Sequence, residues 1–295
     1  MPTSRAPTNG LTVIATMDTP SVSVRDMVCH GGCVHASPEE CTDATHVVFP
    51  YRGIYLRHVA RDQAVADANH VLFFNAGEGY RVAHPIRGSD ASLSLRLDAA
   101  VLEELAPQAL LNKRSVQGFR VQHRRIDSMT QARVAGIRHH LGKDSTDRLH
   151  IESLALELVS RSLGPRTSQP SDATHGQRRL ADRVKVLLAS DLSRRWTLAE
   201  IGAGMGASPV YLTQVFRRVE GMPLYRYHLQ LRLARALDLL ATRRDVSSLA
   251  ADLGFSSHSH FTAAFRQVYG TSPTTFRCTP GTPTRLANKD GLYAA

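Results

Sequence analysis

Short apolar runs separated by turn residues dominate the first third of the chain. Pro, Gly, Asn and Asp cluster between these runs, as they do between strands. Many short strands in succession predict a small β-barrel or sandwich. The runs fall at residues 47–49, 53–59, 70–74, 80–83 and 92–97.

A helical pattern follows the strands. Asp98 is placed to cap a helix that runs to Leu105, and longer helices are expected over residues 127–141 and 147–163. The last of these contains five leucines, which give it a broad apolar surface. We expect this surface to pack against both the barrel and a second subunit.

Composition divides the chain into five parts. Residues 164–177 are rich in Gly, Pro, Ser and Thr without apolar periodicity, which is typical of a linker. Residues 1–20 are expected to form a flexible arm, and residues 280–295 a flexible tail. The predicted fold class is therefore α+β. It combines a small β-barrel with helices at 21–163 and an all-α domain at 178–279.

The helical region after the linker contains one pattern twice. Each copy has a short helix, a turn of Gly and Ser residues, and a second helix with one apolar and one polar face. A long helix from Pro223 to about Ala241 connects the copies. A single helical core with a solvated face does not account for this duplication, so we predict two helix–turn–helix units. Leu212, Phe216, Arg217, Gly221 and Tyr227 recur 49 residues later as Phe261, Phe265, Arg266, Gly270 and Phe276.

The polar face of each second helix carries side chains suited to DNA. Gln, Thr and Arg match base edges and phosphates in the major groove. The arginines are expected at phosphates, with ordinary solvated positions as the alternative. The predicted DNA-binding residues are Val210, Thr213, Gln214, Arg217, Arg218, His258, Ser259, Thr262 and Arg266.

Charge supports the same conclusion because it is unevenly distributed. The whole chain has a formal net charge of +10. Residues 178–279 contain 15 Lys/Arg and 7 Asp/Glu, a net +8, so the rest contributes only +2. A positive field on one domain is expected for a polyanion partner. No long apolar run or lipidation signal points to a membrane, and we expect a cytoplasmic protein.

Residues 178–279 resemble the DNA-binding domain of the AraC/XylS family of bacterial regulators, most closely in LAADLGFSSHSHFTAAFRQVYGTSPTTFR. The resemblance implies seven helices, promoter binding next to RNA polymerase, and usually activation. The segment before the linker resembles, in architecture, the cupin-like barrel and dimerisation helices of such regulators. That resemblance implies a homodimer and a small effector. By position, the family's base-contacting residues fall on Val210, Thr213, Gln214, His258, Ser259, Thr262 and Ala263.

Two departures from the family pattern concern the helix–turn–helix units. Ala263 stands where a longer polar residue is common, so the second unit is expected to read little sequence directly. Gly202, Gly204 and Gly206 weaken the first helix of the first unit, each by up to about 1 kcal/mol relative to Ala. We therefore expect packing to hold that unit together.

Two candidate sites lie in the N-terminal part. Phe74, Tyr80 and His84 surround a strand end and are candidates for an effector pocket, with plain surface or core roles as the alternative. Three cysteines with interleaved histidines suit a soft tetrahedral ion such as zinc. A thiol redox switch and unrelated reduced cysteines remain open. The predicted metal ligands are Cys29, Cys33, Cys41 and His35.

The sequence lacks the features that two other function classes require, and no catalytic residues are predicted. A metal-dependent cupin-type enzyme needs a His-x-His on a strand, but the His258-Ser259-His260 sequence falls in the second helix–turn–helix unit. A DNA-repair methyl acceptor needs a cluster of four cysteines, and only three precede the linker. The leading prediction is a DNA-binding transcription regulator.

Overall fold

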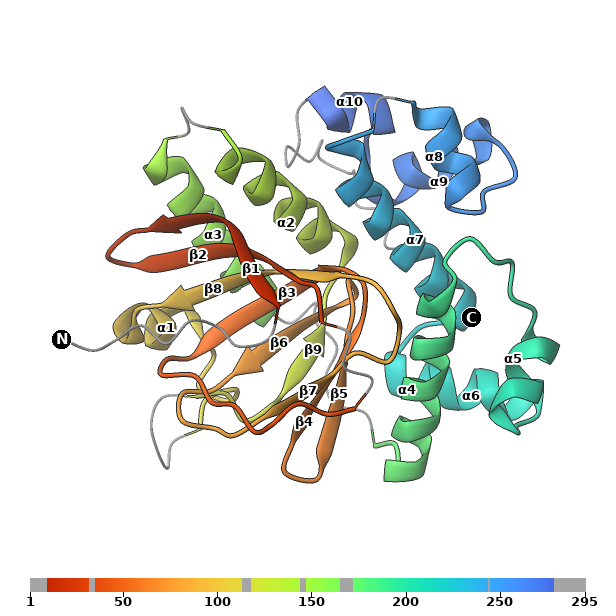
Figure 1. Cartoon of the computed structure of the whole chain (residues 1–295), viewed down its shortest axis with the longest axis horizontal. Coiled ribbons are helices and arrows are strands. Elements are labelled where there is room, and N and C mark those ends of the chain that lie inside the picture. The colour runs from red at the N-terminus through yellow and green to blue at the C-terminus, as the bar shows by residue number, and fades with distance from the viewer. Residues whose placement is uncertain are drawn as a thin grey trace.

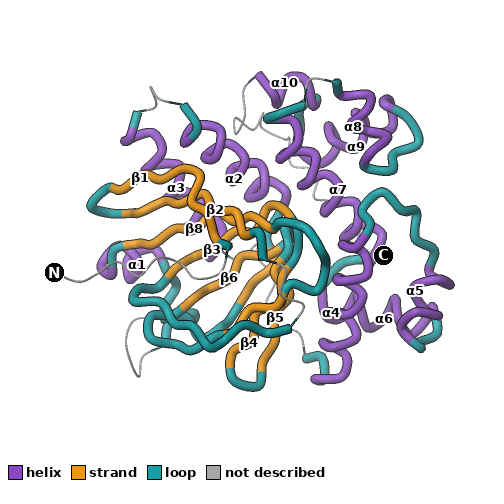
Figure 2. Tube along the Cα trace, in the orientation of Figure 1, coloured by secondary structure: helices purple, strands orange, loops and turns teal. Residues whose placement is uncertain are grey.

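The architecture is that of a computed structural model, which describes residues 10–31, 35–112, 118–143, 147–164, 172–243 and 245–278. Strands dominate its N-terminal region, and helices make up the described C-terminal region (Figures 1 and 2). This arrangement confirms the predicted combination of a β-rich part and a helical part.

The strands form two antiparallel sheets. Among the described residues the two sheets are separate, so the predicted barrel is not closed. The first sheet has the order β1 (Leu11–Asp18), β2 (Val22–Cys29), β8 (Asp90–Leu97), β3 (His46–Arg52), β6 (His70–Phe74) and β9 (His123–Arg125), and the second β5 (Asp62–Ala66), β4 (Tyr55–Val59) and β7 (Arg81–Ala83).

The first sheet has one apolar and one polar face, because side chains alternate along its strands. In β8, Leu93 and Leu95 are fully buried in the main hydrophobic core. Ser92 and Ser94 point to the opposite face, where a cavity lies. The apolar face packs against the helices α1 (Ala99–Leu105), α2 (Ser128–Leu141) and α3 (Arg148–Leu163).

The predicted helices of the N-terminal part are confirmed. Asp98 caps α1 by accepting a hydrogen bond from the Ala100 amide. Asp127 and Asp147 cap α2 and α3 in the same way. A carboxylate at this position satisfies an amide that has no partner within the helix.

Two segments differ from the expected arm and linker. Residues 11–18 form β1, because this stretch rich in β-branched residues pairs with β2 along its length. Helix α4 begins at His175, inside the expected linker, because Thr174 and Gln177 form a capping box. The first nine residues, residues 165–171 and the expected tail lie outside the described residues.

The C-terminal helices build two adjoining cores. Phe216 and Tyr227 are buried in the first core, and Phe261 and Phe265 in the second. Helix α7 contributes to both, so it fixes the two halves relative to each other. The helices are α4 (His175–Ser190), α5 (Leu198–Met205), α6 (Pro209–Glu220), α7 (Leu224–Leu240), α8 (Val246–Asp252), α9 (His258–Tyr269) and α10 (Pro273–Cys278).

Candidate nucleic-acid interface and ligand cavity

Helix α6 exposes the polar face that the sequence predicts. Val210 is 67% exposed, and Gln214, Arg217 and Arg218 are also exposed. Thr213 is half-buried and donates a hydrogen bond to the Val210 carbonyl. This face is therefore accessible to a partner. Its opposite face, with Leu212, Val215 and Phe216, is buried.

Two of the glycines expected to weaken α5 shape the turn before α6. Gly206 ends α5 in the left-handed conformation, with a φ of 67°. A Cβ on Gly202 would lie 2.7 Å from the Ala207 carbonyl oxygen, so the turn passes directly over this residue. Ser208 then caps α6 by accepting a hydrogen bond from the Tyr211 amide. The expected weakening is therefore wrong for Gly206, which follows the last residue of α5 at a position where glycine is favoured, whereas Gly202 lies within the helix and makes room for the turn.

Helix α9 repeats this arrangement in the second unit. Ser257 caps it, and Phe261 and Phe265 anchor it in the core. Its outer face has Thr262 half-buried and the other predicted contact positions exposed, namely His258, Ser259, Ala263 and Arg266. Both units therefore present a comparable outward face.

A close contact joins the two units. Gly254, in the turn of the second unit, has a φ of +72°, and a Cβ there would overlap the carbonyl oxygen of Ser193. Ser193 lies in the loop between α4 and α5, just before the first unit. Arg232 of α7 donates a hydrogen bond to the Leu253 carbonyl and lies 4.6 Å from the Phe255 ring. The position of one unit thus depends on the other.

A cavity of about 510 Å³ lies between the two sheets of the N-terminal region. This volume is within the usual range for small-molecule sites, about 300–1,000 Å³. The predicted pocket residues Phe74, Tyr80 and His84 all line it. Sequence reasoning missed most of the other wall residues, which include Arg25, Met27, Cys29, His46, Val48, Tyr55, Val82, Asp90, Ser92 and Ser94.

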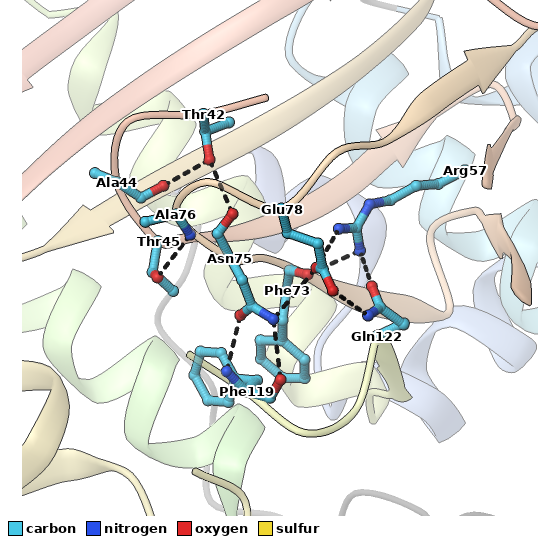
Figure 3. Close-up of polar contacts among 10 residues, drawn as sticks. All are labelled: Thr42, Ala44, Thr45, Arg57, Phe73, Asn75, Ala76, Glu78, Phe119 and Gln122. Atoms are coloured by element: carbon cyan, nitrogen blue, oxygen red, sulfur yellow. Dashed lines mark hydrogen bonds and ion pairs between the residues drawn. The ribbon is translucent and has the colours of Figure 1, made fainter. Parts of the chain in front are cut away.

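A buried arginine supports two of the aromatic wall residues. The Arg57 guanidinium lies 4.0 Å from the Phe74 ring centroid and 5.6 Å from that of Tyr80. It donates hydrogen bonds to the Phe73 carbonyl and the Gln122 side chain, and it pairs with Glu78 (Figure 3). Since Arg57 is only 1% exposed, these contacts hold a charge behind the aromatic wall.

Cys29, His84 and Asp90 meet at one side of the cavity. The Cys29 sulfur lies 3.8 Å from His84 Nε2, and His84 Nδ1 forms an ion pair with Asp90 at 2.7 Å. Asp90, followed by Cys29, raises the pKa of His84 to about 10 despite partial burial. The raised pKa favours the protonated form of the imidazole, whose Nε2 lies beside the Cys29 sulfur.

The other predicted metal ligands lie elsewhere. Cys41 and His35 are exposed, and Cys33 lies outside the described residues. Among the described residues, the potential metal ligands that lie close to Cys29 are His84 and Asp90, rather than Cys41 and His35. Asp90 faces the second nitrogen of His84, which is the position of an outer partner rather than of a ligand.

A buried polar cluster connects the sheet to the helix–turn–helix region. His70, at the start of β6, lies 2.8 Å from Asp67 and 3.4 Å from Glu220 of α6. Glu220 pairs with Lys185 of α4 at 2.6 Å, and Tyr227 of α7 donates to Asp67. All five side chains are buried. We call this group the His70 cluster.

A second polar contact between the regions centres on Arg138 of α2. Its guanidinium pairs with Asp26 of β2 at 3.1 Å and with Asp238 of α7 at 3.0 Å. Arg52, at the end of β3, also pairs with Asp238. Strands β2, β3 and β6 each contain residues that line the cavity. Residues of β3 and β6 also contact the C-terminal helices directly, and β2 is linked to them through Arg138.

Comparison with known proteins assigns the helical region. A family model described as "Helix-turn-helix domain" matches residues 201–278, from α5 to the end of α10. The chain is similar to the HTH-type transcriptional activator RhaR of Klebsiella pneumoniae, with 30% identity over 50% of this chain and 54% of that protein. It is also similar to the HTH-type transcriptional regulator GadX of Escherichia coli, with 25% identity over 84% of this chain and 86% of that protein.

A solved structure gives a similar match. It is a transcriptional regulator from Chromobacterium violaceum described by its AraC-type DNA-binding domain. It is 25% identical, covers 36% of this chain and 95% of its own, and has a TM-score of 0.34. The chain spans between 33% and 54% of the length of the first curated regulators that it matches. In the part of the chain that the structure describes, no helix is both long and apolar enough to cross a membrane.

Proposed function

The C-terminal residues of this chain belong to the AraC/XylS family of helix–turn–helix domains, and from this premise we propose that the whole protein regulates transcription by binding promoter DNA. The observation that supports this most directly is the pair of exposed helix faces on α6 and α9, each fixed by a buried aromatic anchor. The net +8 of residues 178–279 favours a duplex partner. Such a protein would act in the cytoplasm, where bacterial DNA is found.

The N-terminal region is proposed to sense a small effector in the cavity. In this proposal the sheets around the cavity are the counterpart of the cupin-like domain that the family resemblance implies. Occupation of the cavity would be transmitted by β2, β3 and β6, because these strands reach the contacts with α6 and α7 either directly or through Arg138. The cavity, rather than the cysteine loop, is therefore our candidate for the sensory site.

Dimerisation and activation are further parts of the proposal. Leu149 of α3 is 68% exposed, and an apolar side chain on that helix suits a contact with a second copy. The family resemblance supports a homodimer that activates transcription by contacting RNA polymerase. Sedimentation of the Leu149→Glu variant as a monomer would agree with this arrangement.

A bound zinc ion is the second candidate for the sensed species. The convergence of Cys29, His84 and Asp90 favours it, since these are ordinary zinc ligands. However, Asp90 is engaged with the other nitrogen of His84, which leaves two donors from the described residues, whereas zinc usually takes four. An organic effector is therefore better supported. The enzyme alternatives have less support, because His258 and His260 lie on a helix.

Substitutions on α6 separate base contacts from phosphate contacts. For the Gln214→Ala variant, we expect a loss of about 1–3 kcal/mol in binding to a preferred duplex, with the salt dependence unchanged. For Arg217→Ala, we expect weaker binding to all sequences and a reduction of about 1 in the salt slope. Fluorescence anisotropy between about 50 and 200 mM salt measures both quantities.

The duplex for this test is selected from a random library with the unaltered protein. Arg148→Ala serves as the control, because Arg148 is an exposed arginine on α3, outside the helix–turn–helix units. Binding that does not respond to salt, or a Gln214→Ala variant with unchanged sequence preference, would contradict the proposed interface.

A further inference from the structure

The group formed by Cys29, His84 and Asp90 has the arrangement of an activated nucleophile. A thiol becomes a strong nucleophile when an adjacent imidazole holds its proton, and a third group often orients that imidazole. Here the sulfur faces one ring nitrogen of His84, and Asp90 faces the other. Cys29 is half-buried, and all three residues line the cavity.

Space is preserved beside the sulfur. A Cβ on Gly31 would lie 3.1 Å from the Cys29 sulfur and 3.0 Å from His84 Nε2. A larger residue there would crowd both reactive atoms. Glycine at this position keeps the thiol and imidazole open to a molecule in the cavity.

The rest of the cavity suits an organic molecule with a polar group. Val48, Phe74 and Val82 give it apolar walls, and Arg25 and Ser92 offer hydrogen-bond donors. Donors of this kind can hold a carbonyl oxygen while the apolar part packs against the walls. A peroxide would need neither the volume nor these walls.

We propose that Cys29 captures an α,β-unsaturated carbonyl compound bound in the cavity, and that this adduct is the signal. The inference rests on the proposed function, since it specifies the ligand class of the sensory cavity. The proton of the Cys29 thiol is held on His84 Nε2 while the sulfur forms a bond to the β-carbon, and the electron pair of the C=C bond moves to the carbonyl as an enolate. The α-carbon then takes a proton from His84. Nothing leaves, so the protein gains the whole mass of the compound.

The adduct would alter DNA binding through the strands that enclose the cavity. Cys29 is the last residue of β2, and Asp26 of the same strand pairs with Arg138. Arg138 in turn pairs with Asp238 of α7. A group bonded to Cys29 therefore lies on the same strand as Asp26, whose partner Arg138 contacts the helix that joins the two DNA-binding units.

The test compares single-cysteine variants of the full chain. One variant keeps only Cys29 (Cys33→Ser, Cys41→Ser, Cys278→Ser), and its matched control keeps only the exposed Cys41 (Cys29→Ser, Cys33→Ser, Cys278→Ser). Each is incubated at neutral pH with 2-cyclohexen-1-one, and intact-mass spectrometry follows the adduct. We expect Cys29 to react at least about tenfold faster than Cys41. His84→Gln in the Cys29 variant should remove this advantage.

Three results would overturn the proposal. The first is labelling of Cys29 that is no faster than that of Cys41. The second is oxidation of Cys29 by hydrogen peroxide without reaction with the enone, which would indicate a redox switch. The third is one zinc ion bound per chain that blocks labelling, which would indicate a metal site. Because the rates compare two thiols in folded chains, failure of His84→Gln to fold would not prevent the test.

DNA binding is measured separately on the unlabelled and labelled protein. Loss of DNA binding in the unlabelled protein would refute the proposed function while leaving the labelling result intact. Salt-dependent DNA binding together with an inert Cys29 would refute only the present inference. We expect the labelled protein to bind its duplex with a changed affinity, and Cys29→Ser to show no change on treatment.

Discussion

Replacing Lys185 by methionine is expected to lower the free energy of unfolding by about 3–5 kcal/mol. Lys185 is 2% exposed and pairs with Glu220 at 2.6 Å and with Asp182 at 3.0 Å. Methionine fills a similar volume, so the loss of packing is small. The large effect arises because the Glu220 carboxylate stays buried without its main counter-ion, although His70 still lies 3.4 Å from it.

The effect of this substitution should depend on pH. In the native protein, burial acts to raise the pKa of Glu220, but Lys185 and then His70 outweigh it and lower that pKa. The carboxylate therefore stabilises the fold above its unfolded pKa of about 4.3, and this contribution is lost only as the pH falls through the lowered value. Without Lys185, burial raises the pKa of Glu220, so protonation relieves the variant. Its deficit should be largest near neutral pH and smaller below about pH 5.

Urea unfolding followed by fluorescence measures this effect, because the single tryptophan, Trp196, packs against the core that contains α4 and α6. Arg183→Met is the matched control, since Arg183 is exposed on the same helix and should change stability by less than about 0.5 kcal/mol. Adding Glu220→Gln to Lys185→Met should recover part of the loss. A Lys185→Met variant as stable as the control would show that the His70 cluster does not hold the two regions together.

The helix–turn–helix units were predictable because their signals are local. Apolar residues at helical spacing and the 49-residue repeat from Phe216 to Phe265 lie within short segments, and Ser208 and Ser257 mark the helix starts. The structure places most of the predicted DNA-facing residues on exposed faces, with Thr213 and Thr262 half-buried. Whether these residues contact DNA remains a prediction.

The sheets were less predictable because strand pairing is non-local. β8 lies between β2 and β3, which are separated from it by more than 35 residues of sequence. β1 lacks a clear alternation of buried and exposed positions, since Leu11, Val13 and Ile14 are all exposed. The Pro, Thr and Ser content of residues 1–20 predicts an arm, although pairing with β2 makes residues 11–18 a strand.

The two candidate sites in the N-terminal region show the same difference between residues that are close in sequence and residues that are distant in sequence. Phe74, Tyr80 and His84 are close in sequence, which predicts a shared pocket, and they line one cavity. The spacing of the three cysteines likewise predicts a shared site, but Cys29 lies beside His84, 55 residues away. Polar contacts between regions, such as that of His70 with Glu220, have no sequence signal, because an isolated charged residue is usually solvated.

Replacing Gly254 by alanine should both destabilise the helical region and weaken DNA binding. A side chain at a φ of +72° costs about 1–2 kcal/mol. The added Cβ would also overlap the Ser193 carbonyl and approach the Arg232 guanidinium, and such overpacking costs a further 1–3 kcal/mol or so. We therefore expect a total loss of about 2–5 kcal/mol in urea unfolding.

Relief of this overlap requires the second unit to move away from the loop that precedes the first unit. Because both units are proposed to bind one duplex, DNA affinity should fall by more than the change in folded fraction explains. Gly204→Ala is the control: the nearest atom to its added Cβ is 4.0 Å away, and alanine in α5 should stabilise by up to about 1 kcal/mol. If Gly254→Ala binds DNA as tightly as Gly204→Ala, then the contact between Gly254 and Ser193 does not set the spacing of the two units.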